Sequence, residues 1–404
     1  MLDAYIYDGL RTPFGRHAGA LSRVRPDDLL AGVVKEVVSR SGFAPEQIDD
    51  VAVGCASQAG EDSRNVARHA ILLSGLPVAT PGSVHNRLCG SGLNAIVAAA
   101  QAITCGEAGV CLAGGVESMT RAPFVVGKSD QAYSKNFTVY DSSLGARFPN
   151  PKIESEFGAD TMPETADNLA RDYQLSREAC DRFALASQQK YARANDAGFF
   201  QNEINPVIIP QGKGKADVVV ASDEHPRPQT SLESLQKLKP LFSDGVTTAG
   251  NASGINDGAA ALVIASREVG DKAGLRPIAR ILASAVAGVP PRVMGFGPVP
   301  ASKKALERAG LELKDIDVIE INEAFAAQVL ACLKGLGLAF EDSRVNPNGG
   351  AIAVGHPLGA PGARLALTAT RQLQRSGGRY GLVSMCIGVG QGIALVLELS
   401  LIHI

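Results

Sequence analysis

The sequence has no tryptophan, few aromatic side chains, and no excess of charge of either sign. Its 404 residues carry 39 Lys and Arg against 41 Asp and Glu, for a formal net charge of −2. No basic stripe with interleaved aromatic residues occurs, so nucleic-acid binding finds no support. No apolar run reaches the length of a membrane span, and strand-like sequence begins at Tyr5, where a leader peptide would stand. We therefore expect a cytoplasmic protein with neither nucleic-acid nor membrane partners.

Paired cysteines and nucleotide-binding loops are also lacking. The seven cysteines are odd in number and show no C-x-x-C spacing, which disfavours a disulfide framework and a zinc cage and favours a reducing compartment. No phosphate-binding loop with a terminal lysine occurs, and no dinucleotide fingerprint is followed by a ribose-binding acid. The residues therefore give no support to ATP or NAD as ligands.

What the sequence does contain is short apolar runs alternating with helical stretches. With 45% hydrophobic residues the chain is long enough for a large core divided into two or three units. We predict one βα half from residues 1–118 and 247–274, and a second half from residues 275–398. Residues 119–246 are polar and contain prolines, and we predict that they form an inserted region that covers the two halves. Residues 399–404 do not continue the preceding strand pattern, and we expect them to be a non-native tail.

The two predicted halves resemble each other. Residues 89–119 contain a glycine-rich turn, an apolar helix, a strand and two glycines, and residues 355–392 repeat this order. Such a repeat implies duplicated βα units. The strands are apolar throughout rather than alternating, which indicates sheets buried on both faces. The sequence thus predicts an α/β fold built twice from one plan.

Two cysteines and one histidine stand in unusual surroundings. Cys89 lies at the mouth of a predicted helix, where unpaired N–H groups and the helix dipole favour a thiolate. His356 lies in a turn with glycine at both ends, which makes it the candidate base for Cys89. Cys386 lies at the end of a predicted strand, before a glycine-rich turn. Taken alone, this position fits a buried core cysteine as well as it fits a catalytic one. The other five cysteines are expected to be core residues.

Asn322 has two interpretations. It precedes an apolar stretch and could cap a helix that begins at Glu323, as many Asn residues do. Alternatively its amide orients a water molecule or an oxyanion. The residues themselves leave both readings open.

Six motifs together resemble those of the thiolase family, in the same order and across the whole chain except the tail. They are residues 86–92 (NRLCGSG), 114–119 (GGVESM), 250–254 (GNASG), 322–325 (NEAF), 355–357 (GHP) and 386–392 (CIGVGQG). The resemblance implies a duplicated fold layered α-β-α-β-α. It also implies acyl transfer to and from coenzyme A (CoA) as a substrate, with no metal or redox cofactor. In this family homo-oligomers built as dimers of dimers are common.

The resemblance also implies a role for each site residue. Cys89 would attack the ketone of a 3-oxoacyl-CoA, His356 would activate it, and Cys386 would protonate the departing acetyl-CoA enolate. His356 and a water held by Asn322 would bind the enolate oxygen, and the N–H groups of Cys89 and Gly388 would hold the tetrahedral oxyanion. The reverse reaction is a Claisen condensation. The positions that match CoA and channel residues of the family are Arg227, Phe242, Ser253, Ala324, Phe325, Met162 and Met294.

Further segments resemble the thiolases that cleave 3-oxoadipyl-CoA in the degradation of aromatic compounds. They are residues 58–68 (QAGEDSRNVAR), 121–124 (RAPF), 147–151 (RFPNP) and 162–168 (MPETADN). The implied products are succinyl-CoA and acetyl-CoA. A dicarboxylic acyl group needs a cation for its distal carboxylate, and Arg64, Arg147 or Lys152 is the candidate. Each of these cations is equally compatible with a surface or subunit contact.

Alternatives remain within and outside the family. An acetyl-CoA C-acetyltransferase or a 3-ketoacyl-CoA thiolase of fatty-acid oxidation would share all six motifs. A ketoacyl synthase usually pairs its cysteine with two histidines, which Cys386 in its glycine-rich turn argues against. A papain-like hydrolase lacks support in the sequence around Cys89. A non-catalytic acyl-binding homologue should have lost Cys89, His356 or Cys386, and none is lost.

Overall fold

The computed structural model describes residues 1–400, and its centre is one path of hydrogen-bonded strands. Their order is β12-β13-β14-β11-β1-β10-β5-β3-β4, with β2 paired to β10 beside this path. The first half supplies β1 (Ala4–Arg11), β2 (Gly15–Arg16), β3 (Asp50–Gly54), β4 (Gly82–His85), β5 (Val110–Ser118) and β10 (Asn256–Ala265). The second half supplies β11 (Ala279–Gly288), β12 (Val318–Ile321), β13 (Tyr380–Ile387) and β14 (Gln391–Leu399).

The strand order confirms the predicted duplication. The series β1-β10-β5-β3 in one half has the same neighbours and directions as the series β11-β14-β13-β12 in the other. In each series only the last pair is parallel, β3 with β5 and β12 with β13. The two series join where β1 pairs with β11 in antiparallel register.

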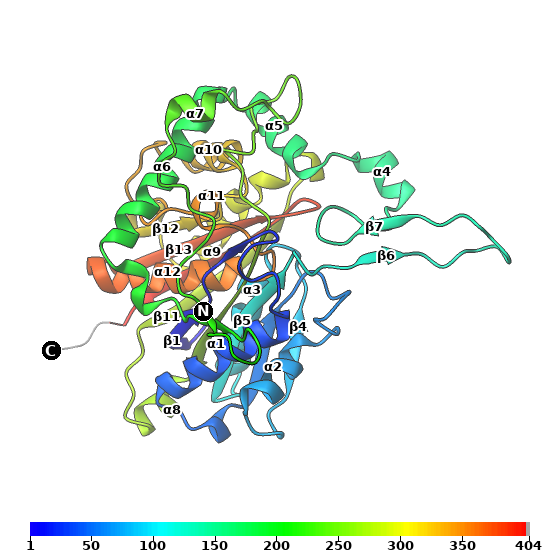
Figure 1. Ribbon diagram of the computed structural model, residues 1–404. Coiled ribbons are helices and arrows are strands. Elements are labelled where there is room, and N and C mark those ends of the chain that lie inside the picture. Colours follow the sequence, from blue (N-terminus) through cyan, green and yellow to red (C-terminus); the bar gives the residue numbers. More distant parts are fainter. Residues whose placement is uncertain (401–404) are drawn as a thin grey trace.

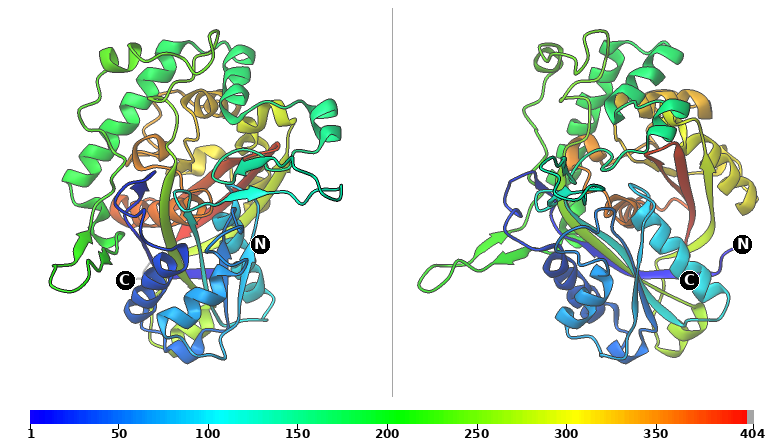
Figure 2. Two further views of the ribbon diagram at one scale, coloured as in Figure 1. Left: turned by 45° about the vertical axis from the view of Figure 1, so that its right-hand side comes forward. Right: turned by 90° about the vertical axis from the view of Figure 1, so that its right-hand side faces the viewer.

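Helices complete five layers, as expected for an α-β-α-β-α fold (Figures 1 and 2). The helices of the two halves are α1 (Pro26–Ser41), α2 (Val66–Ser74), α3 (Ser91–Thr104), α8 (Arg267–Lys272), α9 (Pro298–Ala309), α10 (Ala326–Leu336), α11 (Ala351–Val354) and α12 (Pro361–Ser376). Short 3-10 turns are η1 (Pro45–Gln47), η3 (Pro291–Phe296) and η4 (Leu313–Asp315). Side chains of α1 and α2 cover the outer face of the first half, and those of α9 and α10 that of the second. Both α3 and α12 lie between the two sheet halves. Small and apolar residues dominate their buried faces, as a helix between two sheets requires.

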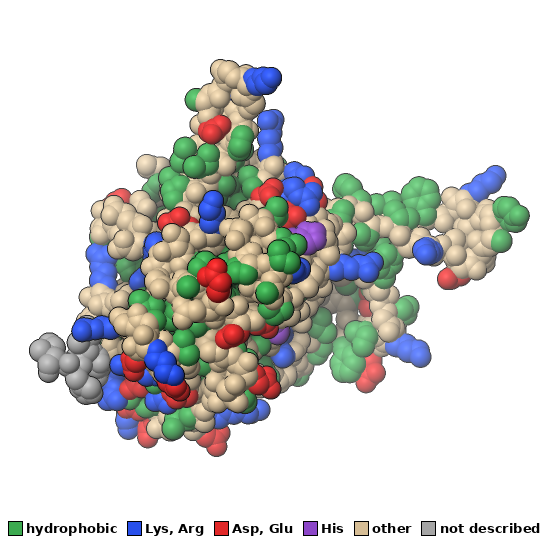
Figure 3. Space-filling view, turned by 90° about the horizontal axis from the view of Figure 1, so that it is seen from below, with side chains coloured by type: hydrophobic (Ala, Val, Ile, Leu, Met, Phe, Trp, Pro, Cys, Tyr) green, Lys and Arg blue, Asp and Glu red, His purple; other side chains and the backbone are tan. Residues whose placement is uncertain are grey.

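Residues 119–246 lie along one end of the two halves and project beyond it (Figure 1). They contain β6 (Phe124–Val126), β7 (Val139–Asp141), α4 (Pro151–Phe157), α5 (Met162–Asp172), α6 (Arg177–Asp196), η2 (Phe199–Asn202), β8 (Val207–Ile209), β9 (Val218–Val220) and α7 (Leu232–Gln236). The pair β6–β7 forms an arm that projects from the body (Figure 1). Hydrophobic side chains are exposed along this arm, Tyr133 fully and Phe137 by 72% (Figure 3).

Two observations concern the remaining expectations about the chain. Leu399 is the last residue of β14 and is paired with Ala279, so the prediction of a tail beginning at residue 399 is wrong for Leu399. The N–H of Ser400 donates to the carbonyl of Ile278 (2.9 Å). Residues 401–404 lie outside the described part of the chain. Within residues 1–400, no helix combines the length and apolar character needed to cross a bilayer.

Candidate active site

Cys89 lies directly before the N-cap of α3, in a loop fixed by its own side chains. The Oγ of Ser91 accepts from the N–H of Arg87 (2.9 Å) and donates to the carbonyl of Leu88 (2.5 Å). Burial raises the pKa of Cys89 to about 11, although the N–H groups of Gly388 and of Cys89 itself lower it. Desolvation therefore outweighs the stabilisation of the thiolate that we expected from the start of the helix. The thiol form predominates at neutral pH, so Cys89 needs a base to become a nucleophile.

Cys386 is the penultimate residue of β13 and pairs with Gly392 of β14. It is buried among Ala166, Met294, Ala324 and Phe325. Burial raises its pKa well above the ordinary value, and the charge of the Cys89 thiolate raises it further. The two thiols are thus electrostatic neighbours, one from each half of the duplicated fold. The following turn brings Gly388 against the side chains of Leu88 and Met162.

His356 lies in the loop between α11 and α12. Its backbone N–H donates to the Oδ1 of Asn256 (2.9 Å). Its ring Nδ1 is buried without a hydrogen-bond partner among residues 1–400. Burial, and to a lesser extent the positive charge of Arg364, lowers the pKa of His356 to about 4. The imidazole is therefore neutral at pH 7 and able to accept a proton.

Gly355 makes this loop possible. Its φ of +110° is accessible to glycine alone without strain, and a Cβ there would lie 2.4 Å from the side chain of Asn256. We expect Gly355→Ala to lower the free energy of unfolding by about 2 kcal/mol or more, measured by urea denaturation. Gly377→Ala is the matched control, because its φ of +70° is also positive but nothing lies near its Cβ position. Equal losses in both variants would contradict a clash with Asn256.

Asn322 follows β12 and is completely buried. It does not cap a helix at Glu323, because α10 begins at Ala326 and its N-cap residue is Phe325. Both Nδ2 and Oδ1 of Asn322 lack partners within the described chain. A buried amide without partners is costly, so this side chain is suited to hold a water or substrate oxygen. Its backbone N–H donates to Ser384 (3.0 Å), two residues before Cys386.

The predicted channel residues fall into two groups. Ser253 donates its N–H to the carbonyl of Ala324 (2.9 Å), and Met294, Ala324 and Phe325 pack around Cys386. Met162, at the start of α5, approaches Gly388. Arg227 is exposed next to His225, which packs against Gly254. Phe242 is half-buried and lies in the turn closed by Gly245 N–H (3.0 Å), outside the residues that surround Cys386.

The three candidate cations for a distal carboxylate differ in their surroundings. Arg64 is exposed, and so is Lys152 in the first turn of α4. Arg147 is half-buried, and its Nη2 donates to the carbonyl of Ser57 (2.5 Å). Its Nη1 is buried without a partner among the described residues. Only Arg147 therefore has a shielded N–H group that is still available.

Two buried polar residues around the site were given no role in the sequence analysis. Asn256 holds the backbone of His356, and Glu117 accepts hydrogen bonds from several backbone N–H groups. A carboxylate near the end of an otherwise apolar strand was the available signal for Glu117. Nothing comparable marks Asn256, because asparagine at the start of a strand is common in turns.

Comparison with known proteins identifies the class. Residues 4–268 match the N-terminal domain of thiolase and residues 275–399 match the C-terminal domain. The chain belongs to the thiolase family and is an acyltransferase.

Named relatives are similar over their full length. The chain is 57% identical to a beta-ketoadipyl-CoA thiolase of Acinetobacter baylyi, over 98% of this chain and 100% of the relative. It is 56% identical to a 3-oxoadipyl-CoA/3-oxo-5,6-dehydrosuberyl-CoA thiolase of Escherichia coli K12, with the same coverage. The crystal structure of human mitochondrial 3-ketoacyl-CoA thiolase in complex with CoA superposes with a TM-score of 0.90 at 42% identity, covering 99% of this chain and 98% of that one.

Proposed function

We propose that this thiolase cleaves 3-oxoadipyl-CoA with CoA to succinyl-CoA and acetyl-CoA. The observation that carries the proposal is the identity of 57% to a beta-ketoadipyl-CoA thiolase over the full length. Identity to the human mitochondrial 3-ketoacyl-CoA thiolase is lower, at 42%. The proposal is tested by measuring thiolysis of 3-oxoadipyl-CoA, acetoacetyl-CoA and a medium-chain 3-oxoacyl-CoA. We expect kcat/KM to be highest for the dicarboxylic substrate, 3-oxoadipyl-CoA. Preference for acetoacetyl-CoA or the medium chain would instead indicate an acetyl-CoA C-acetyltransferase or a thiolase of fatty-acid oxidation.

The proposed first half-reaction begins at Cys89. Neutral His356 takes the thiol proton as the sulfur attacks the C3 carbonyl, and the N–H groups of Cys89 and Gly388 stabilise the oxyanion. When the carbonyl reforms, the C2–C3 bond breaks and its electron pair passes to the acetyl-CoA enolate. His356 and a water on the unpartnered amide of Asn322 bind the enolate oxygen. Cys386 donates its proton to C2, and acetyl-CoA leaves.

The second half-reaction restores both thiols. The Cys386 thiolate takes the proton of the incoming CoA thiol, and the CoA sulfur attacks the acyl group on Cys89. The raised pKa of Cys386 suits both steps, since its neutral form is the resting acid and its thiolate is a strong base. Collapse of the tetrahedral intermediate releases succinyl-CoA, and the Cys89 sulfur regains a proton from His356. No step in this sequence requires a proton donor or acceptor beyond these residues.

Arg147 is the proposed partner of the distal carboxylate, since its buried Nη1 is available. A hydrogen bond between ionised partners is worth about 1.5–3 kcal/mol, so Arg147→Ala should lower kcat/KM for 3-oxoadipyl-CoA about tenfold or more relative to acetoacetyl-CoA. The comparison of substrates controls for loss of the Arg147–Ser57 bond, which affects both. Arg64→Ala serves as the parallel variant. An unchanged substrate ratio in both variants would rule out these arginines.

We also propose a homo-oligomer and a cytoplasmic location. The exposed hydrophobic side chains of the β6–β7 arm favour a subunit contact, as does the unpaired edge of β4 at the end of the strand path. Light scattering on the purified protein tests the oligomer, and a monomer's mass would exclude it. The seven free thiols are typical of a reducing compartment.

A further inference from the structure

Glu117 is a buried carboxylate on β5 that joins segments far apart in the sequence. Its Oε2 accepts from the N–H of Ala56 (2.9 Å) and of Gly359 (3.0 Å). Its Oε1 accepts from the N–H of Ser57 (3.0 Å) and faces the Sγ of Cys55 at 3.7 Å. Glu117 thus satisfies three backbone donors, and its bonds to Ala56 and Gly359 are buried.

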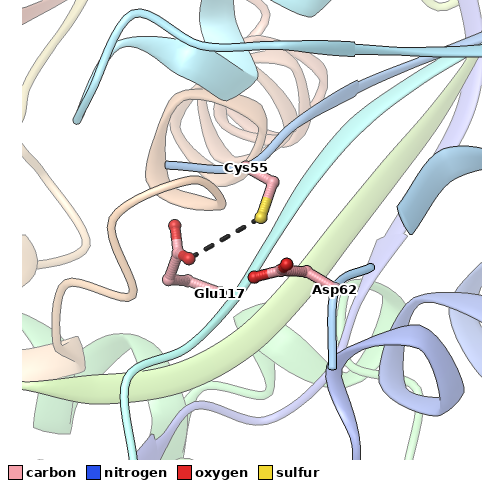
Figure 4. Close-up of side chains that lie close together, drawn as sticks. All are labelled: Cys55, Asp62 and Glu117. Carbon is pink, nitrogen blue, oxygen red and sulfur yellow. Dashed lines mark hydrogen bonds between the residues drawn. The ribbon is translucent and has the colours of Figure 1, made fainter. Parts of the chain in front are cut away.

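The cluster of Cys55, Asp62 and Glu117 resembles a cation site in its residue types, and its ligand atoms lie within 4.8 Å of one another (Figure 4). Its hydrogen bonds argue otherwise. Both oxygens of Glu117 are already directed at N–H donors, whose partial positive charges repel a cation. Backbone N–H groups of residues 58, 60 and 64 also face Asp62, whose Oδ1 has no hydrogen-bond partner among residues 1–400. Because both oxygens of Glu117 are taken by N–H donors, Glu117 organises loops rather than binding a metal.

One arm of the Glu117 network leads to Cys89. Ala56, held at its N–H by Glu117, accepts at its carbonyl from the Nδ2 of Asn86 (3.2 Å). The Oδ1 of Asn86 accepts from the N–H of Leu88 (2.9 Å), the residue before Cys89. The backbone position of the nucleophile therefore depends on Glu117 through three hydrogen bonds and the side chain of Asn86.

The other arm leads to His356. Gly359 follows His356 by three residues, and the N–H of Ala360 donates back to the carbonyl of Pro357 (2.8 Å), which makes a tight turn. The backbone of Gly359 is pressed against Gly92 of α3 and Gly115 of β5. A Cβ on Gly115 would lie 2.0 Å from the Gly359 carbonyl oxygen, and one on Gly92 would lie 2.5 Å from it. The base-bearing loop and the first turn of the nucleophile's helix are thus in direct backbone contact beside Glu117.

We infer that Glu117 is a positioning residue that sets the distance between the Cys89 thiol and the His356 imidazole. This inference rests on the proposed function only for the identity of the two reacting groups. Removing the carboxylate leaves the N–H groups of Ala56, Ser57 and Gly359 without their acceptor, so we expect both loops to move. Arg147 bonds to the carbonyl of Ser57 in one of these loops, so binding of a dicarboxylic acyl group is expected to change as well. No hydrogen bond joins Glu117 to the proposed CoA-binding side chains within residues 1–400, so the loss measured with CoA as the varied substrate should fall on kcat rather than on KM.

Two variants and two readouts test the inference. Glu117→Ala should lower kcat for thiolysis about 10²-fold, the effect of a misplacement of roughly 1 Å, while KM for CoA stays within about threefold of wild type. The rate of iodoacetamide alkylation at Cys89, followed by peptide mass spectrometry, should fall with kcat. Glu117→Gln keeps the size and one carbonyl oxygen, and it should recover part of both rates. Cys55→Ser is the matched control, because it touches Glu117 but holds neither catalytic loop, and it should keep wild-type rates.

The outcomes separate this inference from the proposed function. Wild-type kcat and Cys89 alkylation in a folded Glu117→Ala protein would overturn the positioning role, and so would a rise in KM with kcat unchanged. If Glu117→Ala does not fold, Glu117→Gln is judged alone by the same two readouts. Absence of thiolysis in the wild-type protein would overturn the proposed function. The alkylation rates would still decide the role of Glu117, because that reaction requires no acyl-CoA.

Discussion

Cys89→Ala is expected to abolish thiolysis and its reverse condensation together. The sulfur of Cys89 carries the acyl group in both half-reactions, and no other thiol has the N–H groups of Gly388 and residue 89 directed at it. Loss of a nucleophile that acts with its base as a unit lowers kcat by more than about 10⁴-fold. The decrease in the absorbance of the 3-oxoacyl-CoA enolate, followed in the presence of CoA, measures it.

The variant should still fold and bind CoA. Cys89 lies at the edge of the central core, and truncating a thiol removes little buried surface. Isothermal titration with CoA should therefore give a Kd close to that of the wild-type protein. Residual thiolysis above about 1% of wild type would show that another group carries the acyl chain.

Cys386→Ser should separate the two chemistries of the site. Proton transfer at C2 requires the acid at position 386, and a general acid or base contributes about 10²–10⁴-fold. Thiolysis and condensation should fall by that factor. Transfer of an acetyl group from acetyl-CoA to isotopically labelled CoA needs Cys386 only to take the proton of the CoA thiol, which is far more acidic than the α-proton of a thioester. It should therefore retain a larger fraction of its rate than C–C cleavage does.

The sharper measurement is exchange of the acetyl α-protons of acetyl-CoA with deuterated water, which should disappear in Cys386→Ser. His356→Asn is the useful counterpart, because it should impair acyl transfer to and from Cys89 as well. If Cys386→Ser loses acetyl transfer as severely as C–C cleavage, proton transfer at C2 is not the main role of Cys386.

The fold class and its duplication could be predicted from the sequence because both depend on patterns within short segments. Uniformly apolar strands of a buried sheet and a turn-helix-strand order that occurs twice could both be read directly, and the strand order confirms the duplication. Glycines follow Cys89 and stand at both ends of the His356 turn in the sequence, and in the structure the backbones of Gly92 and Gly359 are in close contact. Their mutual contact across the two halves was not visible in either segment alone.

Three features could not be predicted, each because long-range packing outweighs a local rule. Asn322 looked like a helix cap, but Phe325 stays extended to pair with Ala252, and the helix starts later. Helix position suggested an acidic Cys89, whereas burial dominates its pKa. Glu117 bonds to a residue 242 positions away, and no sequence pattern marks such a partner.

The position of β1 within the strand path has a consequence for biosynthesis. Among the described strands it leaves the ribosome before the others, yet both of its neighbours, β10 and β11, begin at or after Asn256. At about 5–20 residues per second, β1 emerges roughly 12–50 s before its first partner strand. Pairings this distant in sequence make folding slow. The N–H of Gly388 reaches Cys89 only once β13 and β14 are in place, so the nascent chain gains its reactive thiol only after β14 has been synthesised.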